Sequence, residues 1–217
     1  MISGSIVAIV TPMHADGSVD DESLCKLLDW HVESGTDAVV AVGTTGESAT
    51  LNHDEHCEVI GKIIQHVNGR IPVIAGTGAN STSEAVALTR FAAQAGADAA
   101  LLVTPYYNKP QQHGLVAHYR KVARAVDIPI MLYNVPGRTA CNLLPETATE
   151  LAAEPNIVAV KEASGDVDKV TAILEQTDRE SFAVISGEDH LVAEIMRRGG
   201  VGVISASANR WPREFQR

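Results

Sequence analysis

Eight short apolar runs recur along the chain of 217 residues, and stretches with helical periodicity separate them. Successive runs start about 19 to 34 residues apart, which is the spacing of a strand followed by a helix. Several runs, such as Ala38–Val42 and Ala99–Val103, are apolar throughout and do not alternate. Such runs are typical of a parallel sheet that is covered on both faces. We expect strands at 5–10, 37–42, 71–75, 98–103, 128–133, 156–161, 182–186 and 201–205.

Apolar side chains between these runs fall on single helix faces. One face comprises Leu24, Leu27, Leu28 and Val32, and another comprises Leu191, Ile195 and Met196. We expect Asp21 to cap the first helix, and Asn80 or Ser81 to cap the third. Glycine before a strand, as at Gly96 and Gly199, marks a helix end.

Eight strands with seven intervening helices favour a closed barrel over an open sheet, and the first strand-to-helix turn lacks the GxGxxG of a dinucleotide fold. The sequence therefore predicts an α/β fold: a (β/α)8 TIM barrel of eight parallel strands forming one catalytic domain over residues 1–209. Residues 210–217 break the helical pattern. The eighth helix of such a barrel and any further C-terminal helical region are therefore expected to be missing.

Composition excludes several classes of function. The formal net charge is −10 and no run of Lys or Arg could follow a phosphate backbone, so we expect no nucleic-acid partner. No stretch approaches the roughly 18 apolar residues of a membrane span, and no signal peptide is apparent. The cysteines, Cys25, Cys57 and Cys141, have no paired spacing. This pattern favours reduced thiols in the cytoplasm over a disulfide framework or a zinc site.

Polar residues gather where the predicted strands end, which is the face that carries the active site in such barrels. Lys161 is the most informative of them, because it follows the apolar run 156–160. Burial at that position would disfavour the ammonium and supply a neutral amine that attacks a carbonyl. The alternative is a lysine that extends to solvent or pairs with Glu162. Position alone gives the two interpretations about equal weight.

Other strand ends offer weaker candidates. Tyr133 could act as an acid or base, although a tyrosine there more often only packs. Thr44 and Thr45 lie in a glycine-flanked loop that could hold a carboxylate or simply form a tight turn. Arg138 could bind a carboxylate, or be an ordinary exposed arginine. His53 and His56 have metal-like spacing but no third ligand nearby, so we expect no metal.

Three segments, 43–48 (GTTGES), 133–139 (YNVPGRT) and 161–165 (KEASG), together resemble the signatures of the 4-hydroxy-tetrahydrodipicolinate synthase family. They occur in the right order on the right strands, and the resemblance extends from residue 1 to about residue 209. It implies a class I aldolase that condenses pyruvate with L-aspartate-4-semialdehyde, the first committed step towards diaminopimelate and lysine. No cofactor is implied beyond the covalent imine of pyruvate on Lys161.

The resemblance also implies residue roles. Lys161 would form the imine, Tyr133 would shuttle protons, and Thr44 would link Tyr133 to Tyr107 of a neighbouring subunit. Thr45, with backbone around Ile204, would hold the pyruvate carboxylate. The rest of the substrate-binding set would be Arg138, for the carboxylate of the semialdehyde, and Gly187.

A further set resembles the allosteric L-lysine site of feedback-inhibited members of the family. It comprises Ser48, Ala49, His53, His56, Asn80, Glu84 and Tyr106. Helix capping is the alternative role for Ser48 and Asn80. The family resemblance also implies a homo-oligomer, a tetramer built as a dimer of dimers.

Two alternatives stay open at the level of sequence. One is another class I aldolase, such as N-acetylneuraminate lyase or a sugar-acid aldolase, although Arg138 favours an acidic aldehyde substrate. The other is a non-catalytic remnant, because the family continues with helices beyond Asn209. Without a covering helix, the outer surface of the first and last strands would face water. We therefore expect low stability and little turnover from the 217-residue chain.

Overall fold

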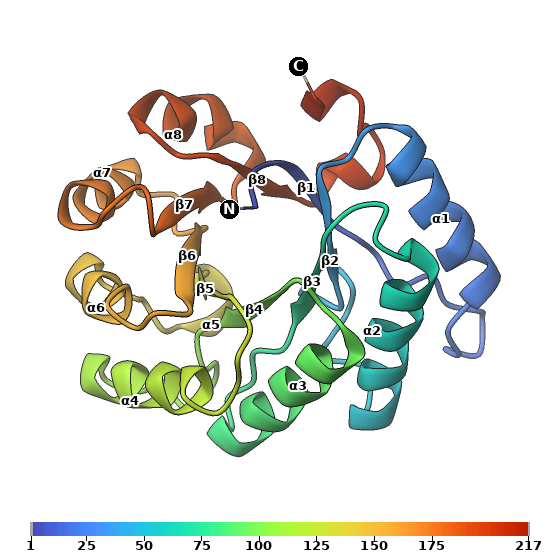
Figure 1. Ribbon diagram of the computed structural model, residues 1–217, viewed down its shortest axis with the longest axis horizontal. Helices are drawn as coiled ribbons and strands as arrows, with labels where there is room; N and C mark the ends of the chain where they lie inside the picture. The colour runs from blue at the N-terminus through green and yellow to red at the C-terminus, as the bar shows by residue number, and fades with distance from the viewer. Residues whose placement is uncertain (1, 217) are drawn as a thin grey trace.

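The structure is a computed structural model that describes residues 2–216, and its centre is a closed barrel of eight parallel strands (Figure 1). The strands are β1 (Gly4–Ala8), β2 (Ala38–Ala41), β3 (Val73–Gly76), β4 (Ala99–Val103), β5 (Ile130–Asn134), β6 (Ile157–Glu162), β7 (Ala183–Ser186) and β8 (Gly202–Ser205). They follow one another around the ring in sequence order, and β1 pairs with β8, with Ile6 opposite Ile204. The predicted fold is confirmed, and each predicted strand is present within two residues at either end.

Helices surround the ring on its outer side (Figure 1). They are α1 (Asp21–Glu33), α2 (His53–Val67), α3 (Thr82–Ala95), α4 (Gln112–Ala123), α6 (Pro145–Leu151), α7 (Val167–Gln176) and α8 (Val192–Arg198). Two shorter elements, α5 (Pro136–Thr139) and the 3-10 turn η1 (Asp189–Leu191), follow β5 and β7. No helix within residues 2–216 has both the length and the apolar character needed to cross a membrane.

Helix ends agree with the sequence in part. The N-cap of α1 is Asp20, whose side chain accepts a hydrogen bond from the Ser23 amide, so the expected cap at Asp21 was wrong by one residue. Ser81 precedes α3 but makes no capping bond with its side chain. Gly96 and Gly199 end α3 and α8 with φ of 95° and 115°, a conformation that favours glycine.

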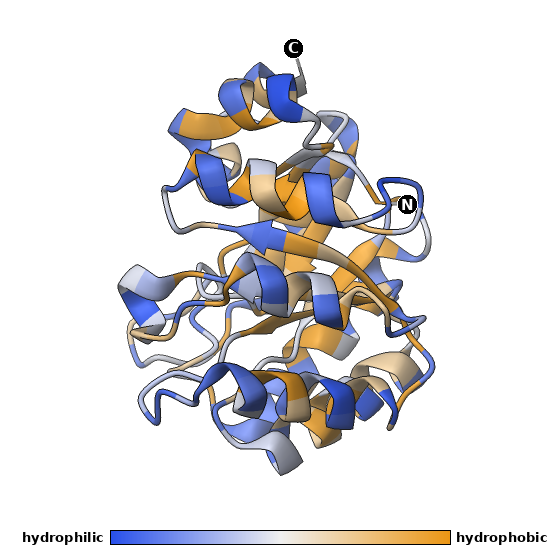
Figure 2. Cartoon of the chain, turned by 90° about the vertical axis from the view of Figure 1, so that its left-hand side faces the viewer, coloured by the Kyte–Doolittle hydropathy of each residue, from blue (hydrophilic) through white to orange (hydrophobic). Residues whose placement is uncertain are grey.

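Small aliphatic residues build the core on both sides of the sheet, and Figure 2 colours much of the strands as hydrophobic. Ile6, Ile74 and Ile204 belong to the cluster inside the barrel, whereas Val7 and Val39 pack outward against the helices. Because strand residues alternate between the two sides, a strand that is apolar throughout serves both. One predicted helix face was wrong in part: Met196 of α8 is 48% exposed, since only the Ile195 side of this short helix reaches the core.

The segment after β8 lies outside the barrel between α8 and α1 (Figure 1). It forms the 3-10 turns η2 (Ser207–Asn209) and η3 (Glu214–Gln216), so no α-helix follows β8 within residues 2–216. The Asn209 amide donates to the Ala8 carbonyl at 2.7 Å, and its side-chain oxygen accepts from the Val10 amide at 3.1 Å. Phe215 packs against the cluster that contains Val7 and Ile9.

These contacts correct one expectation. Val7 and Ile9, on the outer side of β1 and just beyond it, are 0% and 1% exposed. The outer apolar surface at the junction of β1 and β8 therefore does not face water at these residues. Ala208, a member of the same cluster, and Phe215, which packs against it, take part in this covering, although no regular helix carries them.

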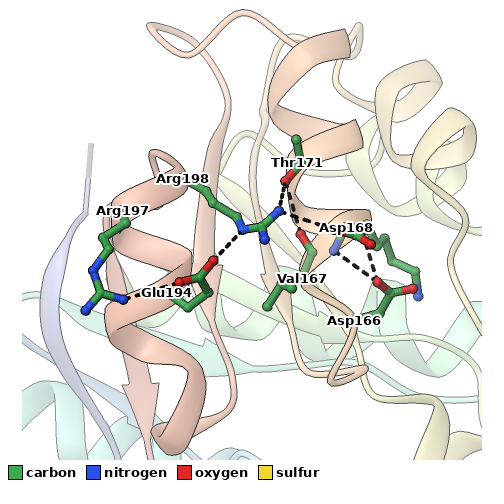
Figure 3. Close-up of polar contacts among 8 residues, drawn as sticks. Asp166, Val167, Asp168, Thr171, Glu194, Arg197 and Arg198 are labelled. Carbon is green, nitrogen blue, oxygen red and sulfur yellow. Dashed lines mark hydrogen bonds and ion pairs between the residues drawn. The ribbon is translucent and has the colours of Figure 1, made fainter.

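A polar network joins α7 to α8 on the outside of the barrel (Figure 3). The Arg198 guanidinium donates to Glu194 one turn earlier at 2.9 Å, to Thr171 at 2.6 Å and to Asp168 at 3.3 Å. Arg197 also donates to Glu194, at 3.2 Å. Exposed ion pairs contribute at most about 1 kcal/mol each, so this network adds little to the stability of the fold.

Candidate active site

A cavity of about 450 Å³ opens at the carboxyl ends of the strands. It brings together seven of the eight residues that were predicted as catalytic or substrate-binding: Thr44, Thr45, Tyr133, Arg138, Lys161, Gly187 and Ile204. They come from segments far apart in the sequence, because parallel strands all end on one face of the barrel. The cavity also contains groups that the sequence analysis did not single out, among them Glu188, Asp189 and His190.

Lys161 lies on β6 directly opposite Tyr133 of β5, and it is only 6% exposed. Its Nζ is 4.3 Å from the centroid of the Tyr133 ring. Burial lowers the pKa of Lys161 from 10.5 to about 8, although the Asp189 and Glu188 carboxylates oppose this shift. At neutral pH a lysine of this kind carries a useful fraction of neutral amine, which an exposed lysine does not.

The alternative in which Lys161 pairs with Glu162 is wrong. Glu162 projects to the other side of β6, where its buried carboxylate accepts hydrogen bonds from the Asn134 amide at 2.9 Å and from the Ser164 backbone at 2.7 Å. Asn134 and Glu162 are register partners, as Tyr133 and Lys161 are. The outer pair therefore joins the ends of β5 and β6 behind the inner pair. Burial raises the pKa of the Glu162 carboxyl, and hydrogen bonds from Ser164 and Asn134 oppose the shift.

The Tyr133 phenol is buried, and burial raises its pKa. The Thr44 hydroxyl and the Arg138 guanidinium act in the opposite direction. The phenol therefore holds its proton at neutral pH while a hydroxyl and a cation lie near it. This arrangement suits a group that passes a proton to or from a bound molecule.

Thr44 and Thr45 lie in the turn that links β2 to α2. Val42, which opens this turn, has φ of 51°, a strained conformation for a β-branched residue. The turn is fixed from behind, because the Thr11 hydroxyl donates to the Gly46 carbonyl at 2.7 Å. A Cβ at Gly46 would lie 3.0 Å from the Ile9 carbonyl oxygen, so only glycine fits without a shift.

Arg138 lies on α5, the single turn that begins at Pro136 immediately after β5. The Arg138 amide donates to the Val135 carbonyl at 2.9 Å, which continues the chain from the strand into this turn. Arg138 is exposed overall, yet it lines the cavity that contains Lys161. The turn thus presents a cation at the mouth of the site.

Gly187 follows β7, and its amide donates to the Glu162 carbonyl at 2.8 Å. A Cβ at this position would lie 2.9 Å from Cε of Lys161 and 2.6 Å from Cβ of Ala163. These distances are too short for carbon atoms that are not bonded. The absence of a side chain at Gly187 therefore leaves the space that the Lys161 side chain occupies.

Tyr107 is the one predicted catalytic residue that does not line the cavity. It is 89% exposed, and its φ is 72°. The predicted role, in which Tyr107 reaches the site of a neighbouring subunit, stays a prediction.

Comparison with known proteins identifies the family. The dihydrodipicolinate synthetase family matches residues 1–217. A relative from Cellvibrio japonicus, named 4-hydroxy-tetrahydrodipicolinate synthase, is 58% identical over 217 residues, which are 100% of this chain and 74% of that protein. The chain belongs to the dihydrodipicolinate synthetase family. It is therefore an enzyme of the lyase class, and the family favours the synthase interpretation over N-acetylneuraminate lyase or a sugar-acid aldolase.

Solved structures of this family have the same fold. The dihydrodipicolinate synthase of Acinetobacter baumannii, described as complexed with pyruvate, has a TM-score of 0.97 at 55% identity and covers 100% of this chain and 74% of its own. The enzyme from Cyanidioschyzon merolae, described with lysine bound, has a TM-score of 0.96 at 43% identity and covers 99% and 73%.

The residues that resemble the family's lysine site lie on the same end of the barrel. Buried His56 of α2 contacts the Gly76 carbonyl through Nε2 at 2.7 Å. Burial lowers the pKa of His56, with a smaller effect of His53 in the same direction, while the Gly76 carbonyl and Glu84 oppose it. These side chains are therefore near one another. The remaining members of the set lie in the loops after β2, β3 and β4: Ser48, Ala49, Asn80 and Tyr106.

Helix capping by Asn80 and a metal site near His53 and His56 were the other roles considered for these residues. Asn80 does not cap α3, because Ser81 holds the N-cap position, and the Asn80 carbonyl accepts a hydrogen bond from the Asn108 side chain at 3.1 Å. Within residues 2–216, no three His, Cys, Asp or Glu side chains lie close enough together to hold a metal ion. The expectation that this protein needs no metal stays a prediction.

Proposed function

We propose that this protein condenses pyruvate with L-aspartate-4-semialdehyde to give 4-hydroxy-tetrahydrodipicolinate, through an imine on Lys161. The observation that carries the proposal is a buried lysine with a pKa of about 8, in a cavity that also contains a phenol and an arginine. A lysine with lowered pKa is the group that forms imines with carbonyl compounds. Family membership supports the choice of substrates.

The first step is attack of the neutral Lys161 amine on C2 of pyruvate. The carbinolamine that results loses its hydroxyl as water, and the product is an imine. Tyr133 is well placed to protonate that leaving hydroxyl, since it lies opposite Lys161 on the next strand. The protonated imine then draws electrons from C3, and the Tyr133 phenolate takes up the C3 proton to give the enamine and restore the phenol. Thr45 and the backbone near Ile204 hold the pyruvate carboxylate.

The second substrate brings the specificity. The carboxylate of the semialdehyde pairs with Arg138, which presents the aldehyde carbon to C3 of the enamine. As the carbon–carbon bond forms, the aldehyde C=O bond opens, and its oxygen takes up a proton to become the hydroxyl of the product. The amine of the same substrate then attacks the imine carbon. This attack closes the ring and releases Lys161 as a free amine, so no external cofactor is consumed.

The proposal also covers the pathway, the location, the assembly and the effector of the enzyme. We place it in the biosynthesis of diaminopimelate and lysine, in the cytoplasm, as a homo-oligomer in which Tyr107 completes the site of a neighbour through Thr44. L-lysine is the proposed effector at the site formed by His53, His56 and Glu84. The Cyanidioschyzon merolae enzyme, described with lysine bound, supports lysine as a ligand within this family.

The experiment is a condensation assay of the purified chain with pyruvate and L-aspartate-4-semialdehyde, and a parallel cleavage assay with N-acetylneuraminate. We expect condensation that Lys161→Ala abolishes, and no cleavage of the sugar acid. Cleavage without condensation would overturn the proposal.

A further inference from the structure

Asp189, the first residue of η1, lies in the wall of the cavity that contains Lys161. Its Oδ2 accepts a hydrogen bond from the Ser207 amide at 3.2 Å, which ties the loop after β7 to the end of β8. Its Oδ1 is buried and has no hydrogen-bond donor among residues 2–216. A buried carboxylate oxygen without a donor is costly unless a positive charge lies near it.

The charged and titratable groups that face Lys161 come from three elements. Tyr133 of β5 lies under its nitrogen, Arg138 projects from α5, and Glu188, Asp189 and His190 follow β7 and line the same cavity. Burial has the largest effect on the pKa of Lys161 and lowers it. Among the charges, Asp189 has the largest effect and raises the pKa, Glu188 raises it less, and Arg138 lowers it.

The two carboxylates differ in how solvent screens them. The Glu188 side chain is 35% exposed and lies 3.8 Å from His190, whereas Oδ1 of Asp189 has no contact with solvent. A charge that water does not reach acts more strongly on a neighbour than an exposed one does. The buried oxygen of Asp189 is therefore less screened from the Lys161 nitrogen than the Glu188 carboxylate is.

We propose that Asp189 is a positioning residue whose carboxylate is the counterion of the Lys161 nitrogen, and that it stabilises the positive charge of the protonated imine. This inference rests on the imine proposed above. A protonated imine draws electrons from C3 of pyruvate far better than a neutral one. A counterion that keeps this nitrogen protonated at neutral pH therefore speeds enamine formation without touching the substrate.

The test is the pH dependence of imine formation, measured as the rate at which cyanoborohydride fixes pyruvate on Lys161. Asp189→Asn keeps an oxygen that accepts from Ser207 but removes the charge. The ammonium then loses its counterion, so the neutral amine persists to lower pH. We expect the acid limb of the profile to move down by roughly one pH unit. Turnover at the plateau should fall by about tenfold, because the imine is protonated less.

Asp98→Asn is the matched control. The Asp98 carboxylate also accepts a backbone hydrogen bond, from Val73 at 2.8 Å, but it lies before β4 at the opposite end of the barrel. Asp98→Asn removes the same charge, and the acid limb of its pH profile should stay in place. Glu188→Gln should move the limb in the same direction as Asp189→Asn, by a smaller amount. Melting curves check that each variant is folded, and Asp189→Ser replaces Asp189→Asn if the latter does not fold.

An unmoved acid limb in a folded Asp189 variant would overturn the inference, even if turnover fell, because loss of packing alone would not shift the profile. A larger shift in Glu188→Gln than in Asp189→Asn would transfer the role to Glu188. If the wild-type chain formed no adduct on Lys161, the proposed function itself would fall, and the inference with it.

Discussion

The Nζ of Lys161 lies 4.3 Å from the centroid of the Tyr133 ring, and the register of β5 and β6 places the two residues directly opposite each other. Behind them, Asn134 and Glu162 form the next pair of the same ladder and are joined by hydrogen bonds. The amine and the phenol are thus held by two regular strands. This rigidity matters because an error of about 1 Å in the position of a catalytic group can cost a hundredfold in rate.

Removal of the cation at the mouth of the site should separate the two substrates. We expect Arg138→Ala to impair use of the semialdehyde by roughly ten- to a hundredfold, because a charge-assisted contact contributes about 1.5–3 kcal/mol. Imine formation with pyruvate should change far less. The measurement is kcat/KM for the semialdehyde beside the rate of adduct formation. Arg124→Ala, which removes an exposed arginine paired with Glu154, is the control. Equal losses in both assays would make Arg138 a structural residue.

A methyl group at Gly187 should displace the nucleophile. Because a Cβ there would lie 2.9 Å from Cε of Lys161, we expect Gly187→Ala to slow imine formation at least about tenfold. Gly137→Ala is the matched control, since a Cβ at Gly137 meets nothing within 4 Å. The measurement is the rate of adduct formation in the two variants, and melting curves check that each variant is folded. Normal kinetics in Gly187→Ala would show that the Lys161 side chain has room to move.

Two buried histidines should make the fold sensitive to acid. Burial lowers the pKa of His31 and of His118 from 6.5 to about 4, and Nε2 of each is buried without a partner among the described residues. The unfolded chain therefore binds more protons than the folded one between pH 6.5 and pH 4. Stability is fully present above pH 6.5 and should fall below it by about 1.4 kcal/mol per pH unit for each histidine.

Urea unfolding at pH 7, 6 and 5 measures this dependence. In His118→Asn the slope should be shallower than in the wild type, whatever the change in absolute stability. His113→Asn, which alters an exposed histidine on the same helix, should keep the wild-type slope. Identical slopes in all three proteins would mean that His118 does not contribute to the acid sensitivity.

L-lysine should bind beside α2. We expect Glu84→Ala to weaken lysine binding at least about tenfold, because a carboxylate near His56 is the charge that an ammonium group requires there. Calorimetry on the assembled oligomer gives the affinity. Glu58→Ala, which removes a carboxylate paired with Lys62 on the same helix, is the control. Unchanged affinity in Glu84→Ala would remove this site from the proposal.

The strands and the position of Lys161 could be predicted because they depend on local pattern, whereas the roles proposed for Lys161 and Tyr133 came from the family resemblance. A run that is apolar throughout indicates a strand covered on both faces, and the residue at its end, here Lys161, then faces the site. Glu162 and Asp189 could not be assigned in the same way. Their roles depend on which groups from other strands approach them, and a carboxylate next to a lysine in sequence reads first as its partner.

The same limit explains why several other features could not be predicted. Met196 fits the helical spacing of Ile195, but α8 is only seven residues long and buries a single narrow side. The steric role of Gly187 depends on contact with Lys161 and Ala163 across strands. Phe215 packs from an irregular segment against the cluster that contains Val7, and periodicity carries no information about such a segment.

The central claim is that Lys161 is the nucleophile, and one measurement tests it directly. Pyruvate and borohydride are added to the protein, and peptide mass mapping locates the reduced adduct. We predict one adduct, on Lys161, which is lost in Lys161→Ala. It should persist in Lys169→Ala, because Lys169 is also buried but donates to Asn142 at 2.8 Å on the outer side of the barrel. An adduct on another lysine, or the same adduct yield in Lys161→Ala as in the wild type, would contradict the account.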